Sequence, residues 1–282
     1  MRVSLIQMAV SFGRPQENFA RVLQLLNQAV QEEPDVIVLP EMWNTGYALS
    51  DLAQLSDKEG QKTQELLSQF AREHKVALVA GSVAVQEAGQ FFNRTYVYGK
   101  DGQLLSSYDK VHLFGLMAED RYLTAGQQES HFELAGVKAS NVICYDIRFP
   151  EWLRTLMADG AQILFVVAEW PQARMEQWEI LLKARAVENQ TFVVAVNRVG
   201  DDPDNHFNGH SLIINPLGQV ILQASDDQEG IFTADLDLTQ VDQTRGHIPV
   251  FDDRKPELYH WGGRYEIWRI AIIEGPAQAI FC

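Results

Sequence analysis

The chain has 282 residues, of which 46% are hydrophobic and 22% are charged, and its formal net charge is −15. This composition is typical of globular proteins, and the length suits one or two domains. The acidic balance argues against nucleic-acid and anionic-membrane partners, which call for basic patches, but it leaves room for a small anionic substrate held by a few local arginines.

The sequence also indicates a compartment. No charged leader with an apolar stretch and a cleavage site precedes the first predicted strand, so we expect no signal peptide. No run of about 18 or more apolar residues is present, so we expect no transmembrane helix. The two cysteines, Cys144 and Cys282, are too few for a disulfide framework. We therefore expect a cytoplasmic protein in a reducing environment.

The first 82 residues alternate between predicted strands and helices. Strands are predicted at residues 3–10, 35–40 and 76–82, and helices at residues 17–32 and 60–74. The first helix carries an apolar stripe at helical spacing, formed by Phe19, Val22, Leu23, Leu26, Ala29 and Val30. This β-α-β-α-β order predicts an α/β fold in which helices cover a largely parallel sheet.

A hairpin is predicted next, because two β-rich runs at residues 92–98 and 104–108 flank the turn sequence Gly99-Lys100-Asp101-Gly102. Lys110 follows the second run almost at once. Residues 111–130 then form a long predicted loop with polar and glycine punctuation. Loops of this length in compact domains are often functional.

The second half repeats this order. Strands are predicted at residues 141–143, 162–168, 191–197 and 231–236, helices at residues 150–159 and 173–188, and a hairpin at residues 211–215 and 219–223. Regular periodicity is lost after residue 240. We therefore expect one domain over residues 1–240, and a tail over residues 241–282 that packs on the body or on a neighbouring subunit.

Cys144 lies at the end of a predicted strand, on a sharp connection to a helix whose first position is Pro150. A thiol there is presented near the positive end of a helix, which favours the reactive thiolate. The alternative is an inert core cysteine, which is common among buried free thiols. On its own, the cysteine does not decide between them.

Three chemically useful side chains stand just beyond predicted strand ends: Glu41, Lys110 and Cys144. In open α/β sheets ligands bind at the C-terminal edge of the strands. A carboxylate, an amine and a thiol there supply a base, a cation and a nucleophile. Each of the first two also fits a solvated surface position. Their apolar and aromatic neighbours in the sequence argue against that interpretation.

The segments around these residues resemble the signature blocks of the nitrilase superfamily, the carbon–nitrogen hydrolases. The blocks are Leu39-Pro40-Glu41-Met42, Tyr108-Asp109-Lys110-Val111-His112-Leu113-Phe114 and Cys144-Tyr145-Asp146-Ile147-Arg148-Phe149-Pro150-Glu151. Further matches are Leu182-Lys183-Ala184-Arg185-Ala186-Val187-Glu188-Asn189 and Gly209-His210-Ser211 with Pro216-Leu217-Gly218. The resemblance covers roughly residues 1–240, and three blocks in the same order make it specific.

The resemblance implies a four-layer α-β-β-α sandwich and a Glu-Lys-Cys catalytic set without a cofactor. Glu41 is then the general base, and Cys144 attacks the amide carbon to form a thioester. Lys110 stabilises the oxyanion together with the backbone N–H of Tyr145. Family members often add a second glutamate after the lysine, and Glu119 is the matching candidate, with Asp120 next to it as an alternative.

Within the superfamily, the closest resemblance is to the ω-amidases. It rests on His112-Leu113-Phe114 and on the segment Trp170-Pro171 with Arg174 and Trp178. Such enzymes hydrolyse small dicarboxylate monoamides such as 2-oxoglutaramate and 2-oxosuccinamate, whose anionic far end needs a cationic donor. Arg174 is the candidate for this role, and a salt bridge to the following helix is the alternative. For Arg148, a structural ion pair is expected.

Several expectations remain more open. Trp43, Phe114 and Trp170 either wall a small substrate pocket or belong to the core. His112 is expected to be structural rather than part of a Cys-His dyad. His206 and His210 lie in a predicted loop and do not suggest a metal site. A homodimer is expected through residues 152–157 and 177–187, with residues 260–273 as a second apolar surface.

Other functions stay open at this point. Another branch of the superfamily, namely a nitrilase, an N-carbamoyl hydrolase or an aliphatic amidase, is the main alternative to an ω-amidase. A catalytically silent relative that serves as a binding module is a further one. The presence of all three catalytic residue types argues against a silent relative.

Overall fold

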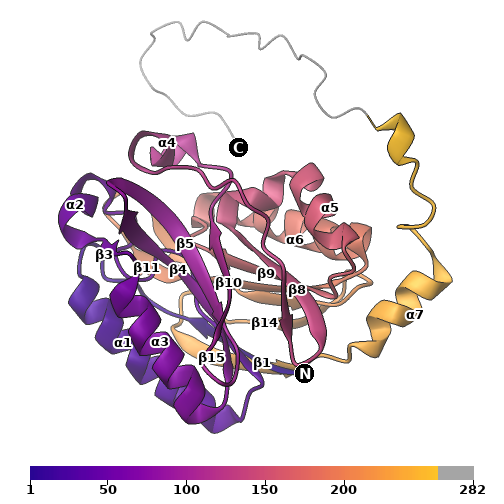
Figure 1. Ribbon diagram of the computed structural model, residues 1–282, viewed down its shortest axis with the longest axis horizontal. Helices are drawn as coiled ribbons and strands as arrows, with labels where there is room; N and C mark the ends of the chain where they lie inside the picture. The colour runs from indigo at the N-terminus through magenta and orange to yellow at the C-terminus, as the bar shows by residue number, and fades with distance from the viewer. Residues whose placement is uncertain (260–282) are drawn as a thin grey trace, which may run out of the picture.

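The computed structural model describes residues 1–259, which form two β-sheets packed face to face between two layers of helices. In Figure 1, α1 (Pro15–Ala29) and α3 (Gln61–His74) lie together on one outer side, and α5 (Pro150–Ala158) and α6 (Met175–Asn189) lie on the opposite side. The expected four-layer α-β-β-α sandwich is therefore confirmed.

The first sheet is built mainly by the N-terminal half of the chain. Its strand order is β15-β1-β2-β4-β5-β6, with a short β3 beside β4. The strands are β1 (Arg2–Gln7), β2 (Val36–Val38), β3 (Asp57–Lys58), β4 (Ala77–Glu87), β5 (Gln90–Tyr98), β6 (Leu104–Asp109) and β15 (Gly230–Asp235). The central strands β1, β2 and β4 are parallel, whereas β15, β5 and β6 pair antiparallel with their neighbours.

The second sheet follows the same plan. Its order is β14-β13-β10-β9-β8-β7, and β8, β9 and β10 are parallel. The strands are β7 (Phe132–Leu134), β8 (Val137–Ile143), β9 (Ile163–Ala168), β10 (Phe192–Asn197), β13 (Leu212–Ile214) and β14 (Val220–Gln223). In each sheet three parallel strands are followed along the chain by an antiparallel hairpin. The predicted repetition of the two halves is thus confirmed.

Side-chain alternation in the first sheet explains why it is buried on both faces. Successive residues of a strand point to opposite faces. Val36 and Val38 of β2 join the hydrophobic cluster shared with the second sheet, whereas Ile37 between them joins the cluster under α1 and α3. In β4, Val79 and Leu78 divide in the same way. A continuous β-branched run therefore serves two cores at once.

The helices bury the faces that their sequences predict, with one correction. In α1, Leu23 is 37% exposed, and Leu25 is buried instead, together with Phe19, Val22, Leu26 and Ala29. A shift of this kind follows from the 3.6-residue turn, which places Leu25 between Val22 and Ala29 on the buried face. The outer helices α5 and α6 bury Leu153, Leu156, Trp178 and Leu182 against the second sheet.

Short elements account for most differences from the predicted order. The predicted loop at residues 111–130 contains a 3₁₀ turn (Gly115–Met117) and the single-turn helix α4 (Glu119–Tyr122). Another single turn, α2 (Leu52–Leu55), and the paired strands β11 (Val199–Asp201) and β12 (His206–Asn208) were not predicted. Such elements carry too few residues for a periodic pattern to stand out.

Regular structure continues past residue 240, where the sequence shows no regular periodicity. Residues of α7 (Thr239–His247) follow β15 and pack on the body: Arg245 Nη2 donates to the Ala161 carbonyl at 2.6 Å, and Gln190 Nε2 donates to the Ile248 carbonyl at 2.7 Å. The division into residues 1–240 and 241–282 stays a prediction. Residues 260–273 and Cys282 lie outside the described residues.

No helix within residues 1–259 is long and apolar enough to cross a membrane.

Candidate active site

The three predicted residues meet at one end of the two facing sheets. Glu41 follows β2, Lys110 directly follows β6, and Cys144 directly follows β8. All three side chains are buried, with exposed fractions of 0%, 0% and 5%. A carboxylate, an ammonium and a thiol have therefore been removed from water together, although each comes from a different strand.

Backbone conformation at two of these strand ends is constrained. Cys144 has a φ of +45° and Met42, next to Glu41, has a φ of +44°, in the left-handed region that L-residues rarely adopt. Such strain persists where the surroundings over-determine it, often at active sites. Gly81 of β4 allows the close approach: a Cβ there would lie 2.1 Å from the Pro40 carbonyl oxygen, just before Glu41.

Glu41 is held on both oxygens. Its Oε1 accepts hydrogen bonds from Lys110 Nζ at 2.9 Å and from Asn93 Nδ2 at 2.8 Å, and Tyr47 Oη lies 2.9 Å away. Its Oε2 accepts from the backbone N–H of Glu169 at 2.7 Å. With this many donors the carboxylate has one orientation, which leaves Oε2 as the oxygen with spare acceptor capacity.

Lys110 is shared between two carboxylates. Its Nζ lies 2.7 Å from Glu119 Oε1 and 2.9 Å from Glu41 Oε1. Glu119 in turn accepts from the backbone N–H of Phe114 at 2.6 Å, and Tyr47 Oη lies 2.6 Å from its Oε1. The structure thus brings Glu119 to the cluster.

The charges in this cluster shift pKa values in opposite ways. Burial acts to lower the pKa of Lys110, but Glu119 and Glu41 outweigh it, so the pKa lies well above its usual range and the side chain stays an ammonium. Burial raises the pKa of Glu119, with Lys110 opposing and Glu41 adding to the shift. Two carboxylates around one ammonium leave the cluster negative when all are ionised.

The thiol responds to this negative surplus. Burial raises the pKa of Cys144 well above its usual range; Glu41 and Glu119 act in the same direction, and Lys110 opposes them. The expectation that the strand-to-helix connection favours a thiolate is therefore corrected. Desolvation and two nearby carboxylates outweigh the partial positive charge at the start of a short 3₁₀ turn.

A buried carboxylate ties the thiol's turn to the lysine segment. Asp146 Oδ2 accepts from Tyr108 Oη at 2.8 Å and from the Ile143 N–H at 3.0 Å, and its Oδ1 accepts from the His112 N–H at 2.9 Å. The His112 ring lies against Asp146, with 2.8 Å between Nδ1 and Oδ1, and stacks on Phe149. The contacts of His112 are thus structural, as expected, and they fix Cys144 relative to Lys110.

Aromatic and cationic side chains pack on one another close to the catalytic cluster. The Arg174 guanidinium lies over the Phe114 ring at 5.2 Å, and the Phe114 ring packs on Tyr145 with centroids 4.7 Å apart. Arg148 lies over Trp170 at 4.9 Å. Burial lowers the pKa of Arg174, Cys144 opposes this shift and Arg148 adds to it. The Arg174 guanidinium therefore lies within electrostatic reach of both Arg148 and the thiol.

The structure places one predicted pocket residue elsewhere. Trp43 is fully buried in the core under α1, where its ring packs edge-on against Phe19 at 4.9 Å and its Nε1 donates to the Ala80 carbonyl at 2.8 Å. The proximity of Trp43 to Glu41 in the sequence favours a place in the pocket. The turn after β2 instead directs the Trp43 ring into the core under α1 and α3. Four of the residues predicted to bind substrate lie in contact with one another in the structure: Phe114, Tyr145, Trp170 and Arg174. Trp43 lies apart from them.

Sequence reasoning also missed residues that contact Glu41. Tyr47 stands in the turn Trp43-Asn44-Thr45-Gly46-Tyr47, Asn93 lies within β5, and Glu169 follows β9. A signal existed for Glu169, because it follows a wholly apolar strand in the same way as Glu41 does. For Asn93 the signal is weaker: it is a polar side chain that the predicted hairpin directs inward.

Comparison with known proteins agrees with this geometry. Residues 2–246 match the model of the family described as Carbon-nitrogen hydrolase. The chain therefore belongs to the carbon–nitrogen hydrolase family, whose members are enzymes.

Individual relatives are similar over most of the chain. The 2-oxoglutaramate amidase of Bacillus subtilis (strain 168) is 47% identical over 257 residues, which is 91% of this chain and 98% of the relative. The omega-amidase NIT2 of Xenopus tropicalis is 33% identical, covering 92% and 96%. A crystal structure of a carbon–nitrogen hydrolase superfamily protein from Xanthomonas campestris, with an arsenic adduct in its active site, has a TM-score of 0.85 at 30% identity, covering 93% and 99%.

The raised pKa of Cys144 makes a prediction about the resting protein. We expect Cys144 to remain protonated at pH 7 to 8.5, where an ordinary thiol begins to ionise. Thiolate absorbance near 240 nm, recorded as the difference between the unaltered protein and Cys144→Ser, tests this because the other cysteine, Cys282, is common to both. A difference signal that rises around pH 6 to 7 would show instead that the turn stabilises a thiolate.

Proposed function

We propose that the protein is an ω-amidase that hydrolyses the terminal amide of small dicarboxylate monoamides through a thioester on Cys144. The observation that supports this proposal most directly is the buried Glu41–Lys110–Glu119 cluster beside this thiol, with the Arg174 guanidinium within electrostatic reach of the thiol. The similarity to the 2-oxoglutaramate amidase of Bacillus subtilis supports the substrate class.

Acylation begins with proton transfer. Because the thiol is protonated at rest, Glu41 takes the Sγ proton as sulfur attacks the amide carbon. The carbonyl oxygen becomes an oxyanion, which the Lys110 ammonium and the backbone N–H of Tyr145 stabilise. The C–N bond then breaks, Glu41 returns the proton to the leaving nitrogen, and ammonia departs from a thioester.

Deacylation uses the same groups. Glu41, again a carboxylate, removes a proton from a water molecule that attacks the thioester carbon. Lys110 stabilises the second oxyanion, the C–S bond breaks, and the proton on Glu41 passes to the departing sulfur. The products are the dicarboxylate and the restored thiol, and no cofactor takes part.

Glu119 and Tyr47 hold the catalytic side chains in place. Two carboxylates raise the pKa of Lys110 and hold its Nζ in place, so the ammonium charge persists without water around it. The Tyr47 hydroxyl bridges Glu41 and Glu119 with contacts of 2.9 and 2.6 Å. We assign Glu119 to the catalytic set on this ground.

Arg174 is proposed to hold the far carboxylate of the substrate. Within residues 1–259 neither Arg174 nor Arg148 forms an ion pair with a carboxylate, so neither of the structural pairs considered from the sequence is found there. Arg174 is half-buried and its pKa is lowered by desolvation, which a bound carboxylate reverses. Phe114, Tyr145 and Trp170 form the aromatic surroundings of the pocket.

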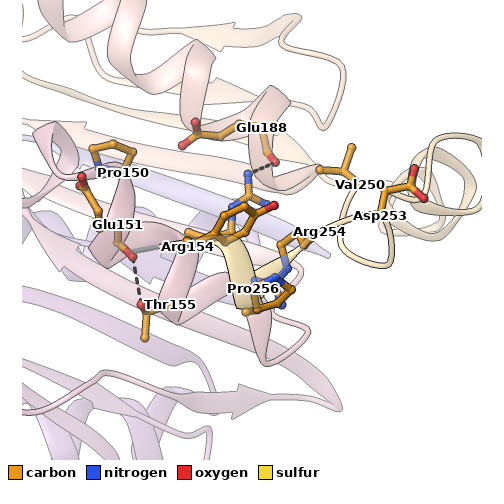
Figure 2. Close-up of a pocket in the computed structure, with 11 residues that line it drawn as sticks. Pro150, Glu151, Arg154, Thr155, Glu188, Val250, Asp253, Arg254 and Pro256 are labelled. Carbon is orange, nitrogen blue, oxygen red and sulfur yellow. Dashed lines mark hydrogen bonds between the residues drawn. The ribbon is translucent and has the colours of Figure 1, made fainter. Parts of the chain in front are cut away.

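We also propose a cytoplasmic homodimer that associates through α5 and α6. On α6, the apolar side chains of Ile180 and Val187 are 59% and 51% exposed and lie seven residues apart, on the same face of the helix. Beside them lies a hollow of about 800 Å³, shown in Figure 2 and lined among others by Glu151, Arg154 and Thr155 of α5 and by Val250, Arg254 and Pro256. A partner subunit covers both features in this proposal.

The first test concerns the catalytic set. Cys144→Ser is expected to abolish turnover of 2-oxoglutaramate, because the higher pKa of a hydroxyl prevents ionisation by Glu41. Glu41→Gln is expected to lower kcat by about 100- to 10,000-fold, the usual contribution of a general base. Lys110→Ala is expected to lower kcat by about 100- to 1,000-fold, the usual loss for an oxyanion donor. Ammonia release measures all three.

Mass spectrometry supplies the complementary observation. A slow substrate should leave an acyl adduct on the peptide that contains Cys144. An adduct on Cys282, or a Glu41→Gln variant that keeps more than about a tenth of kcat, would contradict the mechanism.

The second test concerns substrate recognition. Arg174→Ala is expected to lower kcat/KM about 10- to 150-fold on a carboxylate-bearing amide, because a charge-assisted hydrogen bond contributes about 1.5–3 kcal/mol. A neutral amide of similar length should be little affected. Arg121→Ala, which removes an exposed arginine of α4, is the matched control for the loss of charge. Equal losses on both amides would assign Arg174 a structural role.

The third test concerns association. Light scattering at micromolar concentration should report a dimer, and replacing both Ile180 and Val187 with aspartate should shift it towards monomer, because each charge would be buried in an apolar contact. Loss of kcat is not required for this outcome. A clean monomer for the unaltered chain would exclude the proposed dimer.

A further inference from the structure

A third glutamate lies directly behind the proposed general base. Glu169 is the first residue after β9, and its side chain is fully buried. Its backbone N–H donates to Glu41 Oε2 at 2.7 Å, and its carbonyl oxygen lies 4.0 Å from Cys144 Sγ. The backbone of one residue, Glu169, therefore contacts both the base and the nucleophile.

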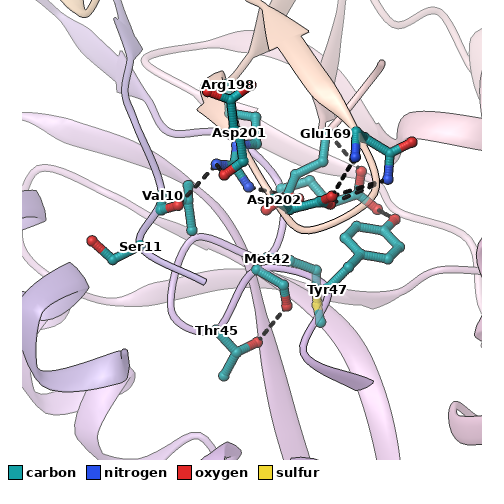
Figure 3. A network of polar contacts seen from close by, with 12 residues as sticks. Val10, Ser11, Met42, Thr45, Tyr47, Glu169, Arg198, Asp201 and Asp202 are labelled. Carbon is teal, nitrogen blue, oxygen red and sulfur yellow. Dashed lines mark hydrogen bonds and ion pairs between the residues drawn. The ribbon is translucent and has the colours of Figure 1, made fainter. Parts of the chain in front are cut away.

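The Glu169 side chain is anchored by an arginine. Its Oε2 lies 3.2 Å from Arg198 Nη1, and both side chains have exposed fractions of 0%. Arg198 is itself fixed: Nη2 donates to the Val10 carbonyl at 2.8 Å, Nε donates to the Val199 carbonyl at 3.2 Å, and the guanidinium lies over the Phe207 ring at 4.5 Å. Figure 3 shows Arg198 between Val10 and Glu169.

The next peptide unit is held just as firmly. Asn197 at the end of β10 accepts from the Trp170 N–H through Oδ1 at 2.7 Å and donates to the Trp170 carbonyl through Nδ2 at 2.9 Å. The Glu169 side chain is thus held by Arg198, and its backbone is held through the neighbouring residue Trp170, which Asn197 binds. The position of its N–H depends on these two neighbours in β10 and just after it.

Burying this carboxylate is costly. Burial raises the pKa of Glu169 to about 8; Arg198 opposes the shift, and Glu41 and Asp202 add to it. Glu169 Oε1 has no hydrogen-bond partner among the described residues. Since a well-packed apolar pair is often as stable as a buried ion pair, stability alone does not explain a glutamate at this position.

We propose that Glu169 is a positioning residue, whose buried contact with Arg198 at 3.2 Å holds the backbone N–H that directs Glu41 Oε2 towards the Cys144 thiol. This proposal rests on the role of Glu41 as general base. Glu41 Oε1 is already occupied by Lys110, Tyr47 and Asn93, so the thiol proton goes to Oε2. Among the hydrogen bonds found within residues 1–259, Glu41 Oε2 accepts one, from the backbone N–H of Glu169.

The decisive variant separates positioning from stability. Glu169→Met combined with Arg198→Met replaces the ion pair with apolar side chains of similar volume, which is expected to keep the protein folded. Without the anchor, kcat should fall about 100-fold with little change in KM, since a misplacement of about 1 Å in a catalytic group has this effect. Glu169→Gln, which keeps an acceptor for Arg198 Nη1, should recover part of the loss.

A second measurement follows the base without the full reaction. Alkylation of Cys144 by iodoacetamide needs the thiol proton removed but forms no oxyanion, so it reports on Glu41 and Cys144 alone. We expect the double variant to be alkylated about as slowly as Glu41→Gln, and Glu169→Gln to lie between it and the unaltered protein. Mass spectrometry separates the Cys144 product from that of Cys282.

The controls distinguish two kinds of failure. Leu26→Ala, a cavity in the remote core under α1, lowers stability and should leave both rates unchanged. If Glu41→Gln is alkylated at the normal rate, the proposed base itself is wrong. If Glu41→Gln is slow but the folded double variant keeps normal kcat and alkylation, the Glu169–Arg198 contact has only a structural role and the positioning proposal is overturned. Should the double variant not fold, the same result for a folded Glu169→Met, which removes the acceptor for Arg198, would overturn the proposal.

Discussion

The structure depends on one buried cation, the ammonium of Lys110, which has no contact with water. A buried charge persists only when paired, and here two carboxylates pair with it, Glu41 at 2.9 Å and Glu119 at 2.7 Å. The pairing makes the site negative, and this surplus, together with desolvation, keeps the Cys144 thiol protonated. In the proposed mechanism Glu41 both raises the pKa of the thiol and removes its proton, so the thiol is activated only as it attacks the substrate.

Two sheets are needed to assemble this arrangement. The first sheet supplies Glu41 after β2 and Lys110 after β6, and the second supplies Cys144 after β8 and Glu169 after β9. Because the sheets pack face to face, the ends of their strands converge, and the hydrogen bond from the Glu169 N–H to Glu41 joins one sheet to the other. The chemistry therefore tolerates little sliding between the sheets, which their shared apolar core restricts.

The sequence predicted the long elements and the strand-end positions well, because buried parallel strands are β-branched runs that a polar residue terminates abruptly. It did not predict α7, whose sequence is polar and which has a single buried residue, Val241. This helix is held on the body by hydrogen bonds from the side chains of Arg245 and Gln190 to backbone carbonyl groups. Trp43 shows a second limit: proximity in sequence to Glu41 did not reveal that the turn directs this ring into the outer core. Tyr47 reaches Glu41 through an irregular turn and Asn93 reaches it by tertiary packing, and hydrophobic periodicity encodes neither contact.

The distribution of charge around the thiol separates chemistry from recognition. The negative cluster of Glu41, Glu119 and Lys110 lies beside the thiol, and the Arg174 guanidinium lies within electrostatic reach of the thiol and of Arg148. A dicarboxylate monoamide has the complementary polarity, with a neutral amide at one end and a carboxylate at the other. In a chain of net charge −15, an anion bound the wrong way round would meet the carboxylates of the cluster. In the proposed reaction, the acidic cluster would therefore also repel the charged end of the substrate, which favours binding with the amide over Cys144.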